Sequence, residues 1–127
     1  AIRKDLNIPD VVQQGARKTL SAALTAIDQS SLAEHAYLSG DSVTLADLAA
    51  YVEIGQLQPQ FTNVFDFSPY PNVQRWLNRM QQVAGHDAVH VVLAELGDIS
   101  QAAPDMDQIR AANIKALQAL KFELGTL

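Results

Sequence analysis

Two histidines and an aspartate have the spacing in this sequence that comes nearest to a metal site. His86 and His90 are four residues apart, so they share one face of a helix. A helical pair of imidazoles with this spacing can bind zinc. In the zinc-peptidase pattern a glutamate follows the first histidine and a third ligand comes later, whereas here Asp87 follows and no further histidine does. We therefore expect no metal, and we interpret the segment as a solvated polar face with Asp87 near a helix N-terminus.

The other common catalytic arrangements have no counterpart in the sequence. The chain has no cysteine, which excludes disulfides, thiolate metal ligands and a cysteine nucleophile. It also has no Gly-x-Ser-x-Gly turn for a serine nucleophile and no glycine-rich loop for a phosphate. Trp76 lies on an apolar helical stripe, so we interpret it as a core residue and not as a ligand-stacking one.

Composition and charge place the chain among globular domains. It has 127 residues, of which 48% are hydrophobic and 18% charged, as expected for one packed domain. The net charge is -5, and Arg3-Lys4 and Arg17-Lys18 are its only basic doublets, so we expect no nucleic-acid partner. No apolar run is long enough to span a membrane, and no signal-peptide pattern opens the chain. A cytoplasmic location is the expectation.

The spacing of the apolar residues predicts an all-α bundle of about five helices. Helices are predicted from about Pro9, from Thr44 until Pro59 stops it, from Pro71, over 86–96, and from Pro104 onward. Residues 9–97 form the expected core of a single domain, and 98–127 add a C-terminal helix. The inward faces are predicted to consist of Val12, Ala16, Leu20, Ala23, Leu24 and Ile27, then Leu45, Leu48, Ala49 and Val52, then Val73, Trp76, Leu77 and Met80, and finally Val89, Val92, Leu93 and Leu96. Residues 60–68 carry three phenylalanines without a regular period, which indicates an ordered loop.

The segment Val43–Leu48 has the pattern of a helix start. Thr44 can accept a hydrogen bond from the amide of Asp47, and the Asp47 carboxylate can reach back to the amide of Thr44. This is a capping box, and Val43 and Leu48 occupy the two positions of a hydrophobic staple. An amide left without a partner in a core costs about 1–3 kcal/mol, so a buried helix needs such an end. The motif predicts a central buried helix and carries no chemistry of its own.

Three segments resemble the C-terminal helical domain of the glutathione transferase family. Tyr37–Leu48 reads YLSGDSVTLADL and is similar to the family signature (F/Y)LxGDxxTxAD(L/I), in which the Thr-x-x-Asp box caps a helix in the domain core. Tyr70–Met80 resembles the (Y)PxVxxWxxRM helix, especially of theta-like members. Leu24–Asp28 resembles the end of the preceding helix. The matches occur in the family order and cover about residues 12–96.

The resemblance implies one half of a two-part protein. In the family a thioredoxin-like domain comes first, binds glutathione and activates its thiol. No segment here resembles that domain, and the family's long preceding helix has no counterpart before Val12. The resemblance therefore implies no catalytic residue and no cofactor in this chain, with glutathione as co-substrate of the full-length family. It places Tyr51 on a helix that borders the substrate pocket, which makes Tyr51 the candidate substrate-binding residue.

Two functions follow from the resemblance. The first is the electrophile side of a glutathione transferase, in which a glutathione thiolate attacks an electrophile. The alternative is a non-catalytic interaction module, as in the elongation factor 1 gamma subunit and in some aminoacyl-tRNA synthetase complexes. Either function implies a homodimer or a partner domain. A third possibility is an unrelated helical bundle. Without the preceding helix, the first apolar stripe is bare unless the last helix packs on it through Ile109, Ala112, Ala116 and Leu120.

Overall fold

The computed structural model describes residues 8–99 and 101–125, and these residues form helices and loops without a strand. The substantial helices are α1 (Asp10–Gln29), α3 (Leu45–Ile54), α4 (Pro71–Met80), α5 (His86–Leu96) and α6 (Met106–Gly125). Two short turns complete the set: α2 (Ser31–Glu34) and the 3-10 turn η1 (Gly55–Leu57). The predicted all-α fold with about five helices is confirmed. The basic doublet Arg3-Lys4 lies outside the described residues.

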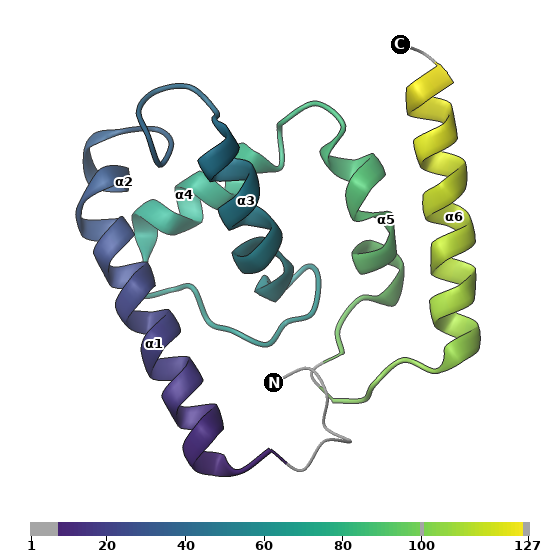
Figure 1. Ribbon diagram of the computed structural model, residues 1–127, viewed down its shortest axis with the longest axis horizontal. Coiled ribbons are helices and arrows are strands. Elements are labelled where there is room, and N and C mark those ends of the chain that lie inside the picture. Colours follow the sequence, from purple (N-terminus) through teal and green to yellow (C-terminus); the bar gives the residue numbers. More distant parts are fainter. Residues whose placement is uncertain (1–7, 100, 126–127) are drawn as a thin grey trace.

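The helices form a body and a hairpin (Figure 1). Helices α1, α2, α3 and α4 pack together as the body, whereas α6 runs antiparallel along α5. Helix α6 lies at the opposite side of the molecule from α1. The last helix therefore does not cover the apolar stripe of the first helix, which was one of the two alternatives left open by the sequence, because it packs beside α5. Ala112, one of the residues expected to face α1, is instead the buried residue of α6.

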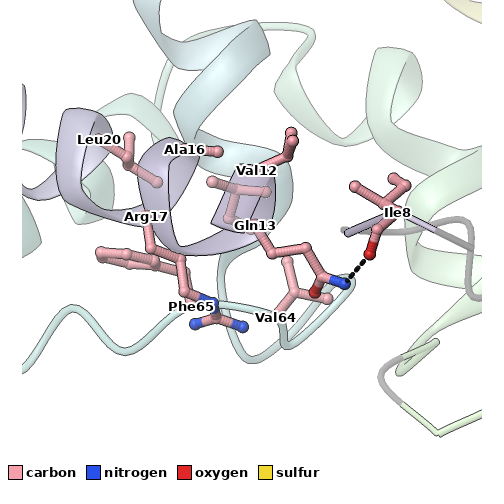
Figure 2. Close-up of a pocket in the computed structure, with 9 residues that line it drawn as sticks. Ile8, Val12, Gln13, Ala16, Arg17, Leu20, Val64 and Phe65 are labelled. Atoms are coloured by element: carbon pink, nitrogen blue, oxygen red, sulfur yellow. Dashed lines mark hydrogen bonds between the residues drawn. The ribbon is translucent and has the colours of Figure 1, made fainter. Parts of the chain in front are cut away.

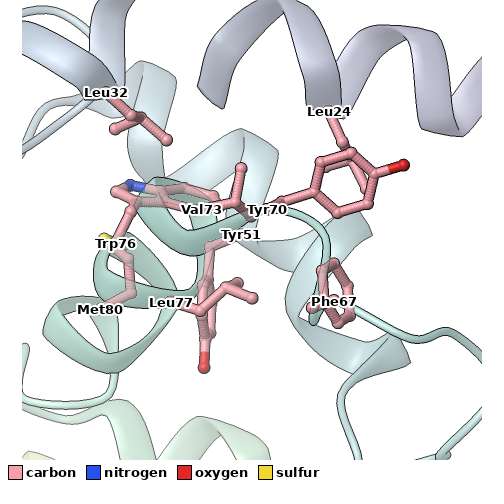
Figure 3. Packing of buried hydrophobic residues seen from close by; sticks show 9 residues of the cluster. All are labelled: Leu24, Leu32, Tyr51, Phe67, Tyr70, Val73, Trp76, Leu77 and Met80. Atoms are coloured by element: carbon pink, nitrogen blue, oxygen red, sulfur yellow. The ribbon is translucent and has the colours of Figure 1, made fainter. Parts of the chain in front are cut away.

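One face of α4 supplies most of the hydrophobic core (Figure 3). Pro71 takes the first helical position, where its missing N–H is no loss. The next apolar residues follow at steps of three and four and so share one face. Trp76 is fully buried there, in agreement with the core role expected for it. The core cluster consists of Leu24, Leu32, Tyr51, Phe67, Tyr70, Val73, Trp76, Leu77 and Met80.

The segment between η1 and α4 is the ordered, aromatic-rich loop that the sequence predicts. Phe61 and Phe67 are buried, and the rings of Phe65 and Phe67 meet edge to face with centroids 5.0 Å apart. The α-helix before the loop ends at Ile54 and continues as η1, so it stops ahead of Pro59 as expected. Phe67 of this loop belongs to the hydrophobic core, and Phe65 packs against it.

Several residues predicted to point inward are exposed. On α3, Leu45 and Val52 are 80% and 61% exposed, and Leu48 also faces outward. The buried face of this helix instead carries Asp47 and Tyr51. On α1, Val12 is 55% exposed, whereas Leu24 is fully buried, so the expectation of a bare stripe holds only for the N-terminal half of α1.

Helix α5 shows the same disagreement with the predicted pattern. Val89 was expected to face inward but is 63% exposed, and Ala88 is the buried residue of this helix. The other residues predicted to face inward, Val92, Leu93 and Leu96, are partly buried. Helix α5 packs mainly against α6.

A buried carboxylate at the end of α1 fixes the start of α4. Oδ1 of Asp28 accepts hydrogen bonds from the amides of Asn72 and Val73, at 2.8 and 2.9 Å. The Asn72 side chain in turn donates to the Asp28 carbonyl oxygen at 2.8 Å. These bonds satisfy amides that a helix N-terminus leaves without an internal partner. Asp28 therefore caps α4 from another helix, a role that the sequence analysis did not assign to it.

We expect the substitution Asp28→Ala to lower the free energy of unfolding by about 1–3 kcal/mol, because two buried amides lose their acceptor. Urea denaturation followed by circular dichroism measures this change. Glu53→Ala on the exposed side of α3 is the control and should change stability by less than about 0.5 kcal/mol. Equal effects of the two substitutions would contradict the capping role of Asp28.

Candidate functional site

The Asp47 carboxylate is fully buried and binds four donors. Its Oδ1 accepts from the Leu38 amide at 2.8 Å and from the Trp76 indole N–H at 2.9 Å. Its Oδ2 accepts from the amide and the hydroxyl of Thr44, at 2.9 and 2.7 Å. The capping box expected from the sequence is present, with Thr44 as the N-cap of α3. One side chain thus joins the helix start, the loop before it and the core tryptophan.

This arrangement keeps Asp47 charged and leaves it no chemistry to perform. Burial raises the pKa of Asp47, but the hydrogen bonds from Leu38, Thr44 and Trp76 together lower it by more than burial raises it. The pKa of Asp47 therefore lies below its ordinary value of 3.8. Stability from these bonds is present above that ordinary value and is lost as the pH falls through the folded-state pKa. The staple stays a prediction, since Val43 and Leu48 are both substantially exposed.

Tyr51 anchors a second buried polar network, at the other end of α3. It is only 3% exposed, and its hydroxyl lies 2.8 Å from Nε2 of His86. Nδ1 of His86 lies 2.9 Å from Oδ1 of Asp87. Because an ionised carboxylate only accepts, we assign the His86 proton to Nδ1, so that Tyr51 donates to Nε2. Gln58 donates to the Tyr51 hydroxyl at 3.3 Å, which gives the network one consistent direction.

Three rings complete this network. The imidazoles of His86 and His90 stack with centroids 4.2 Å apart, and Phe61 stacks on His90 at 5.6 Å. Nδ1 of His90 donates to the backbone carbonyl of His86 at 2.7 Å. Burial lowers the pKa of His90, and burial likewise raises the pKa of Tyr51.

The predicted solvated face around His86 is therefore wrong. The His86 side chain is only 8% exposed, and Asp87 pairs with it instead of capping α5. The reason is a tertiary contact with Tyr51, which local sequence does not show. Among the described residues, no three or more side chains of histidine, cysteine, aspartate or glutamate are grouped so that they could hold a metal ion.

An apolar groove runs along the N-terminal half of α1 (Figure 2). It has a volume of about 180 Å³. Gln13 donates to the Ile8 carbonyl oxygen at 2.9 Å, and the Arg17 side chain and the Phe65 ring both line the groove. Apolar walls with a few polar groups are typical of sites for small hydrophobic molecules. The groove is lined by Ile8, Val12, Gln13, Ala16, Arg17, Leu20, Leu57, Val64 and Phe65.

The structure separates the predicted site residue from this groove. Tyr51 lies in the core, does not line the groove, and has its hydroxyl engaged by His86 and Gln58. Its substrate-binding role stays a prediction. The groove itself was not predicted. The two segments that line it were nevertheless recognisable in the sequence: the apolar stripe that includes Val12, and the phenylalanine-rich loop over residues 60–68.

Comparison with protein families identifies the body of the molecule. The family model for the glutathione S-transferase C-terminal domain matches residues 8–83, which include α1 to α4, the groove and Asp47. The chain belongs to this family. No significant match to a solved structure was found. None of the helices in the described ranges has the length and apolar character needed to cross a membrane.

We expect Asp47→Ala to lower the free energy of unfolding by about 2–4 kcal/mol, because it removes the shared acceptor of several buried donors. Thr44→Ala should lower it by about 0.5–2 kcal/mol as a lost N-cap. The double variant should lose less than the sum, by at least about 0.5 kcal/mol, because the two side chains bind each other.

Thermal and urea unfolding of the four proteins in this cycle measure the coupling. Gln118→Ala on the exposed face of α6 is the control and should leave stability nearly unchanged. Additive losses, or an Asp47→Ala loss no larger than that of Gln118→Ala, would show that Asp47 is not a central junction.

Proposed function

We propose that this chain is the electrophile-side helical half of a glutathione transferase-like protein. Its membership of the C-terminal domain family and the apolar groove along α1 support the proposal. In such a protein a thioredoxin-like domain would bind glutathione, and its thiolate would attack an electrophile held on the helical side. We further propose a cytoplasmic location, in line with the family resemblance. The apolar groove is the observation that carries the assignment.

The groove residues suggest what this half would contribute. Val12, Leu20 and Phe65 would take an aromatic or aliphatic electrophile out of water. Arg17 also lines the groove, and its guanidinium would favour ligands with a negative group. Neither Arg17 nor another groove residue would activate the thiol, so chemistry depends on the second domain.

An interaction module is the second candidate, and a separate surface favours it. The outer face of α3, formed by Leu45, Leu48 and Val52, is apolar and exposed away from the core. Apolar residues grouped in this way often mark a site for another protein. We propose that this face is covered by a second copy of the chain or by another domain, most simply across a two-fold axis.

The isolated chain should show no conjugation of glutathione to an aromatic electrophile, but its groove should bind a hydrophobic anion. Anilinonaphthalene sulfonate is a suitable probe, and titration calorimetry measures its binding. Val12→Glu should weaken this binding at least about tenfold, or 1.4 kcal/mol, because it places a carboxylate in the apolar wall.

The neighbouring residue supplies a matched control. Val11 is exposed on the same helix but does not line the groove, so Val11→Glu should leave probe binding unchanged. Turnover by the isolated chain would show that the thiol-activating group lies in this chain. Probe binding that is unaffected by Val12→Glu would remove the groove as the ligand site and favour the interaction module.

The outer face of α3 predicts self-association. We expect multi-angle light scattering to find a dimer whose fraction rises with protein concentration, and Leu45→Glu to return the monomer by burying a charge. Leu117→Glu is the control, since Leu117 is similarly apolar and exposed but lies on α6. A monomer at every concentration, or equal effects of both substitutions, would contradict a dimer built on α3.

A further inference from the structure

The α5–α6 hairpin is attached to the body by a small set of contacts. Helix α5 packs extensively against α6 and makes only a few contacts with the helices of the body. On the body side, the Tyr51 hydroxyl binds His86, and the Tyr51 ring meets the His90 ring edge-on with centroids 5.5 Å apart. Phe61 stacks on His90. The histidine pair therefore forms one joint between hairpin and body, and a hydrogen bond from Asn63 to Asp98, at 2.9 Å, forms another.

A short link between α4 and α5 lies next to the histidine joint. Helix α4 ends at Met80 and α5 begins at His86, with Gly85 between them at a φ of 80°. A β-carbon on Gly85 would meet no atom within 4 Å, so the glycine serves backbone conformation and not close packing. The family match ends at residue 83, two residues before Gly85.

The joint is built for neutral imidazoles. The ring of His90 lies between Tyr51 and Phe61, and its Nδ1 proton is already donated to the His86 carbonyl oxygen. If both imidazoles of the pair were protonated, two like charges would lie on rings 4.2 Å apart.

The other groups around the pair do not remove this constraint. Phe61 and Tyr51 face the rings from the body and carry no charge at neutral pH. The exposed Asp87 carboxylate pairs with Nδ1 of His86 from the solvent side. Burial nevertheless holds the pKa of His90 below its usual value of 6.5.

We propose that the stacked His86–His90 pair is an acid-sensitive latch, which holds the α5–α6 hairpin against Tyr51 and Phe61 when neutral and releases it as a unit when protonated. An open hairpin exposes both imidazoles to water, so His90 takes up a proton more readily there than in the closed form. The closed form is therefore fully favoured above about pH 6.5, and its population relative to the open form decreases as the pH falls below this value. Each proton changes the ratio of closed to open forms by up to about tenfold per pH unit.

Hydrogen exchange on the whole chain tests the latch at about pH 8 and about pH 5, the ends of the range over which histidine titrates. After correction for intrinsic rates, amide protection in α5 and α6 should fall at least about tenfold at the lower pH, whereas protection in α1 and α4 should persist. His90→Phe keeps a ring on Phe61 but cannot titrate, so the hairpin should stay protected at both pH values.

The third histidine is the matched control. His35 lies near Asp41, partly exposed and outside the joint, so His35→Phe should keep the acid response of the unmodified chain. If His90→Phe does not fold, imidazole titration by NMR in the unmodified chain decides: loss of α5 protection must follow His86 and His90 and not His35. Unchanged protection at low pH, or equal loss in α1 and α4, would overturn the proposal.

Discussion

The buried carboxylate of Asp47 is the constraint on which the body of the molecule depends. A charge in an apolar interior is tolerated only where donors surround it, and here the donors come from three places: the loop at Leu38, the start of α3 at Thr44, and Trp76 on α4. Each of these segments must hold its position for the others to be satisfied. Asp28 repeats the principle at the start of α4. Two carboxylates therefore fix how the helices of the body cross.

Apolar surface is distributed unevenly around this body. The face of α4 is enclosed, whereas the outer face of α3 and the N-terminal half of α1 leave apolar side chains in contact with water. The hairpin does not reach these faces, because α6 packs on α5 at the far side. Such exposed apolar faces fit a domain that packs against a second domain or a partner protein, as either candidate function requires.

The sequence predicted the elements well and their rotation less well. Periodicity, Pro71 and the Thr44–Asp47 box are local signals, so they place helix starts correctly. Hydrophobicity alone predicted that Leu45 and Val52 face the core. In the structure the opposite face of α3 packs on the core, because it carries Asp47 with all of its hydrogen bonds. His86 was assigned to solvent because its partner Tyr51 lies 35 residues earlier in the chain. Interactions between polar side chains that are distant in the sequence leave no local pattern. They are the reason why the orientation of α3 and the burial of His86 were both predicted wrongly.

The position of Trp76 gives the molecule a built-in optical probe. It is the chain's one tryptophan, its indole N–H is bonded to Asp47, and its ring meets Tyr51 edge-on with centroids 6.0 Å apart. At this separation, excitation energy absorbed by Tyr51 is transferred to the indole. Fluorescence from this single tryptophan therefore reports on the surroundings of both Asp47 and Tyr51. The emission wavelength of Trp76 depends on the polarity around Asp47. The emission intensity under tyrosine excitation depends on the position of Tyr51 between the body and the hairpin.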